Sequence, residues 1–373
     1  MNHSLKHWKE AATLIVAAEQ RLCGGSRTTT PPRGTKLTQH LPHASRFDYN
    51  TLLLKRSGKS GFMPNAYVFP GGLVDPTDFS SEWLDVFKSL SSAPRFGLRR
   101  VKQKAETRPP VFATDRVNLG SPIPGEVAFR ICALRETFEE SGVLLVVPRD
   151  TLQRDEDTIH DGIDNDICPD ELKKWRSLVN QNPANFIRMC RELGVLPNIW
   201  ALHEWSNWLT PEGSYGVRRF DTAFFICCLK EIPHTLQDQK EIELFQWSTP
   251  SEVLQSYEAK EFWIAPPQFY ELGRLCQLPS LNDLHRFARE RAVEGCEHWM
   301  PVVTVEDDKL VSLLPGDRLY PGTLSASSTG HDGVAALHRL VIEDSYTVRL
   351  QINIPPKYKH LLPVLPLGSE SLL

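Results

Sequence analysis

The sequence lacks several features that mark particular classes of protein. It has no excess of basic residues, since 42 Lys and Arg face 46 Asp and Glu, so the basic footprint typical of nucleic-acid binding is missing. No uninterrupted apolar stretch approaches the length of a membrane span. The apolar run near the start, Ala11 to Ala18, is short and typical of a buried strand rather than of a secretory signal. We therefore expect no stable nucleic-acid partner and no membrane span.

The eight cysteines form neither a disulfide framework nor a zinc-binding pattern. They are scattered, Cys227 and Cys228 are adjacent, and no C-x-x-C pair is present. The sequence thus predicts free thiols in a reducing compartment. With 373 residues of ordinary composition, the chain is long enough for one large domain or two smaller ones.

One segment, Arg135 to Gly142 (RETFEESG), crowds carboxylates onto a predicted helix that Gly142 would end. Glu136, Glu139 and Glu140 are spaced to share one helix face. Like charges this close repel each other and favour a hard divalent cation such as Mg²⁺, which prefers oxygen ligands. A solvated acidic face is the alternative interpretation. The opposite face is predicted to be anchored by apolar residues at helical spacing: Val127, Ile131, Leu134 and Phe138.

A second motif precedes this helix. Phe69 to Gly72 (FPGG) ends in a glycine turn, and Asp78 follows after five intervening residues. Together the two segments resemble the Nudix box, G-x5-E-x7-R-E-U-x-E-E-x-G-U, in which U is aliphatic. The chain departs from the pattern in three ways: Asp78 replaces Glu, Thr137 replaces an aliphatic residue, and the 56 residues 79–134 stand where the pattern has seven. Glu126 is the other candidate for the first glutamate, and the sequence leaves the two open.

The resemblance implies a fold and a domain organisation. A Nudix hydrolase is an α/β protein, an α/β/α sandwich with a mixed sheet, and residues 8–290 would form that domain. A long insertion inside the Nudix box would occupy about 79–126, and a helical insertion about 150–200. Residues 291–373 would be a strand-rich C-terminal extension. The first insertion is rich in Arg and Lys, which indicates either a solvated loop or a lid that contacts phosphate.

The resemblance also implies the site residues. Glu136, Glu139 and Glu140 would hold Mg²⁺, with Mn²⁺ as an alternative, and would be catalytic together with Arg135. The family's arginine at this position orients the glutamates by ion pairing. The Gly71-Gly72 turn is assigned to substrate binding, because glycine lets the backbone approach metal or phosphate closely. The sequence does not predict which carboxylate acts as the general base.

Further motifs narrow the resemblance to Nudix coenzyme A diphosphatases. Residues 52–57 (LLLKRS) and 62–72 (FMPNAYVFPGG) are similar to the L-L-x-x-R-S and V-x-F-P-G-G elements of those enzymes, and 218–222 (RRFDT) extends the likeness to the peroxisomal acyl-CoA subgroup. The resemblance implies magnesium-dependent hydrolysis of CoA and acyl-CoA to 3′,5′-ADP and 4′-phosphopantetheine or its acyl derivative. Because arginine binds phosphate in a bidentate fashion, further candidates for substrate binding are Arg56, Ser57, Arg218 and Arg219. For each arginine a surface ion pair is the alternative.

Two other functions stay open. The chain would then be a Nudix hydrolase for another nucleotide, such as an RNA cap or NADH, or a catalytically silent nucleotide-binding module. The intact Glu136, Glu139 and Glu140 argue against a silent module, because binding alone does not require crowded carboxylates.

The C-terminus carries a weak targeting signal. Ser371-Leu372-Leu373 is similar to the peroxisomal address S-K-L, except that Leu372 replaces the basic residue. Together with the family resemblance this predicts a peroxisomal location and an import receptor as a partner, with mitochondrion and cytosol as alternatives. The oligomeric state is not predicted.

Periodicity predicts the main secondary structure elements. Strands are expected at about 11–18, 51–56, 67–69, 143–147, 220–229 and 242–247. Helices are expected at about 127–141, 169–193, from 250 onward, 267–276 and 280–292.

Overall fold

The computed structural model describes residues 8–20, 43–61, 63–90, 93–113, 120–149, 167–212, 218–233, 242–322, 335–344 and 346–364, and the structural statements below concern those residues. Among them, no helix combines the length and the apolar character that a bilayer span requires. The seven cysteines in the described part of the chain are all unpaired.

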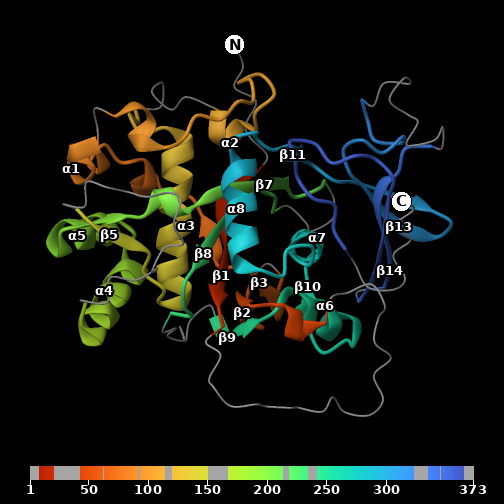
Figure 1. Ribbon diagram of the computed structural model, residues 1–373, viewed down its shortest axis with the longest axis horizontal. Helices are drawn as coiled ribbons and strands as arrows, with labels where there is room; N and C mark the ends of the chain where they lie inside the picture. The colour runs from red at the N-terminus through yellow and green to blue at the C-terminus, as the bar shows by residue number, and fades with distance from the viewer. Residues whose placement is uncertain are drawn as a thin grey trace.

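A nine-stranded mixed sheet forms the centre of the molecule (Figure 1). β1 (Lys9–Glu19) is fully buried from Ala11 to Ala18, and it pairs in parallel with β8 (Phe220–Leu229) and antiparallel with β2 (Tyr49–Arg56). The other strands of this sheet are β3 (Ala66–Val68), β4 (Gly71–Leu73), β7 (His203–Leu209), β9 (Ile242–Ser248), β10 (Trp263–Ile264) and β11 (His298–Trp299). The order is β10-β3-β2-β1-β8-β7-β11, with β4 beside β1 and β9 beside β2.

Helices cover both faces of this sheet, so the predicted α/β/α sandwich with a mixed sheet is confirmed (Figure 1). α3 (Gly125–Ser141) packs on one face, and α8 (Leu281–Ala292) packs on the other. Successive side chains of β1 point to opposite faces of the sheet, so the core has two parts. Leu14 belongs to the hydrophobic cluster under α3, and Ile15 belongs to the cluster under α8. α7 (Pro266–Leu275) contributes to the second cluster.

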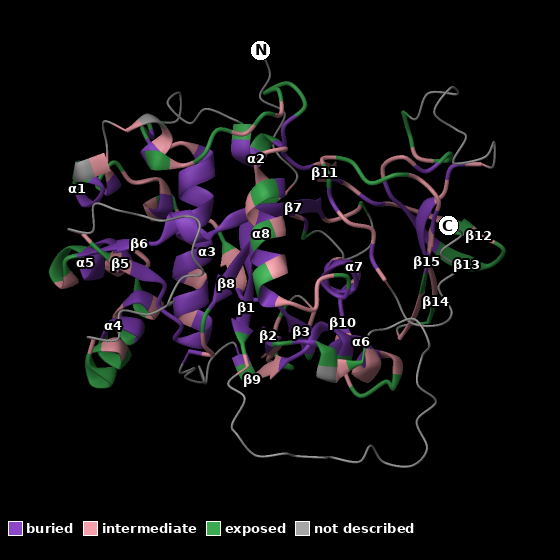
Figure 2. Ribbon diagram, in the orientation of Figure 1, coloured by how far each residue is buried: buried purple, intermediate pink, exposed green. Residues whose placement is uncertain are grey.

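α3 is buried along nearly its whole surface, as Figure 2 shows. Gly142 ends the helix in the left-handed conformation, and its N–H donates to Phe138 O at 2.9 Å. Every residue of the helix except Glu136 and Glu139 is buried. The predicted apolar face is therefore confirmed, but the alternative of a solvated acidic face is wrong, because protein also covers the side that carries the carboxylates.

The helical insertion supports the C-terminal end of α3. Arg176 on α4 (Pro169–Gln181) donates to Glu139 O at 2.9 Å and to Glu140 O at 2.8 Å. Carbonyls of a last helical turn have no partner within the helix, and a cation there is favourable. The single helix predicted at 169–193 is two helices, because the chain breaks before α5 (Ala184–Leu193) at Pro183. Residues 150–166 of this insertion lie outside the described residues.

The C-terminal part forms a separate antiparallel sheet in the order β12-β13-β14-β15. Its strands are β12 (Val302–Glu306), β13 (Lys309–Leu313), β14 (His338–Asp344) and β15 (Thr347–Ile352). The remaining elements are α1 (Trp83–Val86), α2 (Pro110–Ala113), α6 (Pro250–Glu258), β5 (Val146–Pro148) and β6 (Val195–Pro197). The strand predicted at 143–147 is thus shorter than expected, and β7 is a central strand that the sequence patterns did not reveal.

Candidate active site

Arg135 lies at the centre of the acidic cluster. Its side chain is 2% exposed and forms a bidentate pair with Asp78, in which the Nε–Oδ1 and Nη2–Oδ2 distances are both 2.8 Å. Its Nη1 donates to Glu136 Oε1 at 2.8 Å and to Glu139 Oε1 at 2.9 Å. Nη2 also donates to Leu73 O at 3.0 Å. One buried cation therefore orients two of the three glutamates and ties α3 to the glycine turn.

The glycine turn brings backbone against the same carboxylates. The Gly71 N–H donates to Glu140 Oε2 at 2.9 Å. A Cβ added to Gly72 would lie 2.4 Å from Glu136 Oε2, and one added to Gly71 would lie 2.4 Å from Ala12 O on β1. Both positions therefore require glycine, because any side chain would displace a carboxylate or a sheet strand.

Negative charge exceeds positive charge in this cluster. Arg135 contributes one positive charge, whereas Asp78, Glu136, Glu139 and Glu140 each contribute a carboxylate. The pKa of the Glu136 carboxyl is raised to about 7, mainly by burial. The Arg135 guanidinium lowers this pKa, and the nearby Glu139 carboxylate raises it further. A bound divalent cation would favour the ionised form of this carboxyl.

The chemistry of these side chains suits a hard divalent cation, although they are not arranged around one. Among the described residues, no three His, Cys, Asp or Glu side chains surround a common position suited to a metal. Arg135 and the Gly71 N–H instead hold the carboxylates at separate hydrogen bonds. Glu136, Glu139 and Glu140 nevertheless lie within about one turn of α3 and line the same cavity, and their carboxylate oxygens are the ligands that a hard divalent cation prefers. Their role as metal ligands stays a prediction.

The structure favours Asp78 over Glu126 as the counterpart of the first Nudix-box glutamate. Asp78 is 1% exposed, and a short 3-10 helix (Pro76–Phe79) places it against Arg135. Glu126 lies at the other end of α3, about 14 Å from Arg135 along the helix axis. Its carboxylate accepts from Arg95 Nε at 2.8 Å. Of the two candidates, only Asp78 is paired with Arg135, which also holds Glu136 and Glu139.

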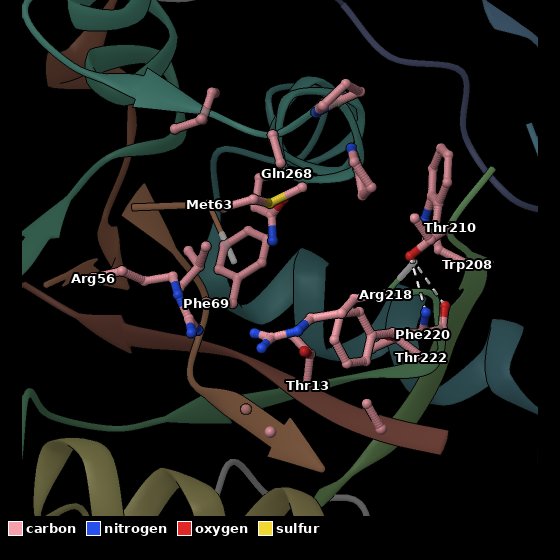
Figure 3. A pocket seen from close by; sticks show the side chains of 18 of the residues that line it. Thr13, Arg56, Met63, Phe69, Trp208, Thr210, Arg218, Phe220, Thr222 and Gln268 are labelled. Atoms are coloured by element: carbon pink, nitrogen blue, oxygen red, sulfur yellow. Dashed lines mark hydrogen bonds between the residues drawn. The ribbon is translucent and has the colours of Figure 1, made fainter. Parts of the chain in front are cut away.

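The carboxylates open onto a large cavity, part of which is shown in Figure 3. Its volume is about 1490 Å³, above the ~300–1,000 Å³ of ordinary small-molecule sites. The glycine turn, loop 57–61, β7, β8, segment 263–269 and the C-terminal sheet all contribute to its wall. A site of this volume accommodates a substrate larger than a mononucleotide.

Arg56 and Arg218 bring positive charge to this cavity. Figure 3 shows the two side chains extending toward one another. Arg56 donates to Ser60 Oγ from Nε at 3.2 Å and from Nη2 at 2.8 Å. Arg218 packs against the same loop, because a Cβ on Gly61 would lie 2.5 Å from its Nη1. Ser57 also lines the cavity. Three predicted substrate-binding residues are therefore brought together beside the glycine turn.

Comparison with known proteins identifies the family. Residues 8–275 match the model of the NUDT19 Nudix domain. The chain belongs to the NUDT19 family of Nudix hydrolases. Residues 303–353 match the model of the NUDT19 C-terminal domain.

Two relatives of this NUDT19-family chain match over nearly their full length. A Xenopus laevis protein named acyl-coenzyme A diphosphatase NUDT19 is 50% identical over 100% of this chain and 99% of that protein. A human protein of the same name is 40% identical over 95% of this chain and 94% of that protein. A crystal structure of a Nudix hydrolase from Alicyclobacillus acidocaldarius is 20% identical, with a TM-score of 0.49, and covers 78% of this chain and 97% of that one. The family model and the Xenopus and human relatives confirm the family predicted from the sequence motifs.

One predicted residue of this Nudix hydrolase does not reach the cavity. Arg219 is buried, is not part of the cavity wall, and donates from Nε to Thr210 O at 3.0 Å and from Nη1 to Glu212 at 3.1 Å. Consecutive side chains of an extended segment point to opposite sides, so Arg218 and Arg219 do not share a surface. The structure therefore places Arg219 against the residues that follow β7 rather than in the cavity wall.

The first insertion also stays away from the cavity. None of its described residues lines the cavity, and two of its arginines form internal ion pairs. Arg95 pairs with Glu126, and Arg108 pairs with Glu204 through contacts of 2.9 and 2.7 Å. The described part of this insertion therefore does not support its interpretation as a lid that contacts phosphate, because none of it reaches the cavity and Arg95 and Arg108 are already paired with carboxylates.

Proposed function

We propose that the chain hydrolyses the pyrophosphate of CoA and acyl-CoA, releasing 3′,5′-ADP and 4′-phosphopantetheine or its acyl derivative. The observation that carries this proposal is one large cavity with the carboxylates, Arg56 and Arg218 in its wall. CoA presents a pyrophosphate to be cut and a separate 3′-phosphate to be bound. The names of the Xenopus and human relatives, acyl-coenzyme A diphosphatase, support the same substrate class.

The residues around the cavity would have different roles in this reaction. Glu136, Glu139 and Glu140 would hold Mg²⁺ or Mn²⁺, which when bound neutralises phosphate charge and makes a water molecule more acidic. Arg135 keeps the Glu136 and Glu139 side chains in place, and the Gly71-Gly72 turn lies in the cavity wall, where it would contact the substrate. Arg56 and Arg218 would bind phosphate oxygens.

A substrate panel tests the proposal. The purified chain is incubated with Mg²⁺ and, separately, with CoA, acetyl-CoA, palmitoyl-CoA, NADH, ADP-ribose and capped RNA, and the products are identified by mass. We expect the CoA species to be cut fastest, with the break inside the pyrophosphate, and chelation of the metal to stop turnover. Preference for capped RNA or NADH would replace the proposed substrate, and turnover of none would favour a silent binding module.

Replacing Arg218 with Ala is expected to weaken substrate binding without harming the fold, because this side chain is exposed at the cavity. A charge-assisted hydrogen bond contributes about 1.5–3 kcal/mol, so the KM for CoA should rise roughly ten-fold or more while kcat changes little. The matched control is Arg286→Ala, since Arg286 is an exposed arginine that pairs with Asp283 on α8.

Dephospho-CoA, which lacks the 3′-phosphate, shows which phosphate Arg218 binds. If the variant and the wild type have the same KM for dephospho-CoA, Arg218 binds the 3′-phosphate; an unchanged difference assigns it to the pyrophosphate. Equal KM values of the Arg218 and Arg286 variants for CoA would remove Arg218 from the substrate site.

We also propose a peroxisomal location. The support is Ser371-Leu372-Leu373, which lies outside the described residues and resembles the address that import receptors bind. Deleting Leu373 should leave the protein cytosolic in a microscopy assay, and a reporter with about twelve C-terminal residues should enter peroxisomes less efficiently than one ending in S-K-L. Import of the truncated protein, or mitochondrial location of the intact one, would contradict this signal.

A further inference from the structure

The cavity continues well beyond the phosphate-binding end. Seven consecutive residues, 263–269, line it from β10 into the first turn of α7. Their side chains are apolar except for Gln268, which Figure 3 shows on α7. In Figure 1, α7 lies between α3 and the C-terminal sheet. The wall therefore changes from mainly charged near α3 to mainly apolar near the sheet, where Ser312 and Asp344 are the polar lining residues.

Gln268 is an unusual residue within this apolar wall. Its side chain is 8% exposed, and its Oε1 is buried without a hydrogen-bond partner among the described residues. Leaving such an acceptor unpaired costs about 1–3 kcal/mol. Gln268 nevertheless lies in the cavity wall, so rotation of its amide toward the cavity would let a ligand supply the missing partner.

The C-terminal sheet provides the far wall. Leu310, Ile342 and Val348 are cross-strand neighbours on β13, β14 and β15, and all three line the cavity. The next row toward the core contributes Val303, Ser312 and Leu340, of which only Ser312 is polar. Leu310 is 49% exposed, which is high for a large apolar side chain. An exposed apolar row that is continuous with a charged site suits one molecule with a charged end and an apolar end.

We propose that this region is the binding site for the acylated arm of the substrate, with Gln268 hydrogen-bonded to an amide of the arm and the Leu310–Ile342–Val348 row in contact with the acyl chain. The inference rests on the proposed function, because acyl-CoA is the substrate that joins a pyrophosphate to an amide-containing, apolar arm. It assigns the C-terminal sheet a role in selecting substrates by chain length. Arg56 and Arg218 hold the other end of the same molecule.

The Gln268→Met variant tests the hydrogen bond. Met fills a similar volume but lacks the amide, so the KM for CoA should rise roughly three- to ten-fold, as expected for the loss of one neutral hydrogen bond. The KM for ADP-ribose, which has a pyrophosphate but no such arm, should not change. Thermal stability should be equal or higher, because the variant no longer buries an unpaired acceptor. A merely structural role predicts the opposite: lower stability and equal effects on both substrates.

Leu310→Gln tests the acyl wall, with Leu319→Gln as the matched control. Leu319 is also 49% exposed in the C-terminal part but does not line the cavity. We expect the Leu310 variant to lower kcat/KM for palmitoyl-CoA about five-fold or more, with less than about two-fold loss for free CoA. Equal behaviour of the two variants, or equal loss for palmitoyl-CoA and free CoA, would overturn the assignment of the sheet.

Direct binding separates this inference from the proposed function. Calorimetry with palmitoyl-pantetheine, which has the acylated arm but no pyrophosphate, is carried out on the wild type and on the Gln268→Met and Leu310→Gln variants. Weaker binding by both variants supports the site even if the wild type fails to hydrolyse CoA, in which case only the proposed reaction is wrong. Absence of binding to the wild type, or identical affinities of all three proteins, refutes the acyl-arm site even if CoA hydrolysis is confirmed.

Discussion

Glu139→Gln and Glu140→Gln are each expected to lower kcat by at least about 100-fold while the protein stays folded. Each change removes a negative charge from the metal-binding cluster and alters side-chain volume little. The amide oxygen of Gln can still accept the hydrogen bonds that Arg135 and the Gly71 N–H now donate. The loss should therefore lie in metal binding and catalysis rather than in stability.

The measurements are kcat as a function of Mg²⁺ concentration and thermal unfolding of the metal-free proteins. Both variants should need more Mg²⁺ than the wild type, and removing one of several crowded carboxylates should leave the unfolding temperature equal or higher. Glu192→Gln is the control, because Glu192 forms an exposed pair with Arg188 on α5 and is not part of the cavity wall. Turnover within about ten-fold of the wild type in both variants would refute this metal site.

The acidic helix and the glycine turn could be predicted because their signals are local. Carboxylate spacing, the apolar positions of α3 and the helix-ending Gly142 lie within a few turns, and they keep their meaning in the fold. Arg56 and Arg218 came from short motifs and do meet at the cavity. Arg219 lies outside the cavity wall. The motif could not predict this, because it carries no information about which side of the chain faces the cavity.

The strand β7 could not be predicted from hydropathy. Its seven residues HEWSNWL are all buried, although four of them are polar. Glu204 is paired with Arg108 from the first insertion, and the Asn207 amide donates to Asp221 at 2.9 Å. Burial of this strand thus depends on partners far away in the chain. The unpaired acceptor of Gln268 could not be predicted from the sequence either. Whether an acceptor is paired depends on the residues that surround it in the fold and not on a sequence motif.

Asp78→Asn is expected to destabilise the fold and to abolish most activity together. Asp78 and Arg135 are 1% and 2% exposed, so the variant leaves a buried guanidinium without its bidentate carboxylate. Breaking a buried ion pair on one side typically costs about 3–5 kcal/mol. Since Arg135 also holds Glu136 and Glu139, the acidic cluster should lose its geometry as well. Urea denaturation and kcat at saturating Mg²⁺ measure the two effects.

Glu126→Gln separates catalytic from structural damage. Glu126 is buried and paired with Arg95 and Arg108, so its replacement should also lower the free energy of unfolding. It does not contact Arg135, so kcat of the folded protein should stay within about two-fold of the wild type. Asp78→Glu, which introduces the residue type of the Nudix pattern, should retain far more activity than Asp78→Asn because it keeps the charge. If Glu126→Gln lost as much kcat as Asp78→Asn, the first Nudix-box glutamate would have its counterpart in Glu126 after all.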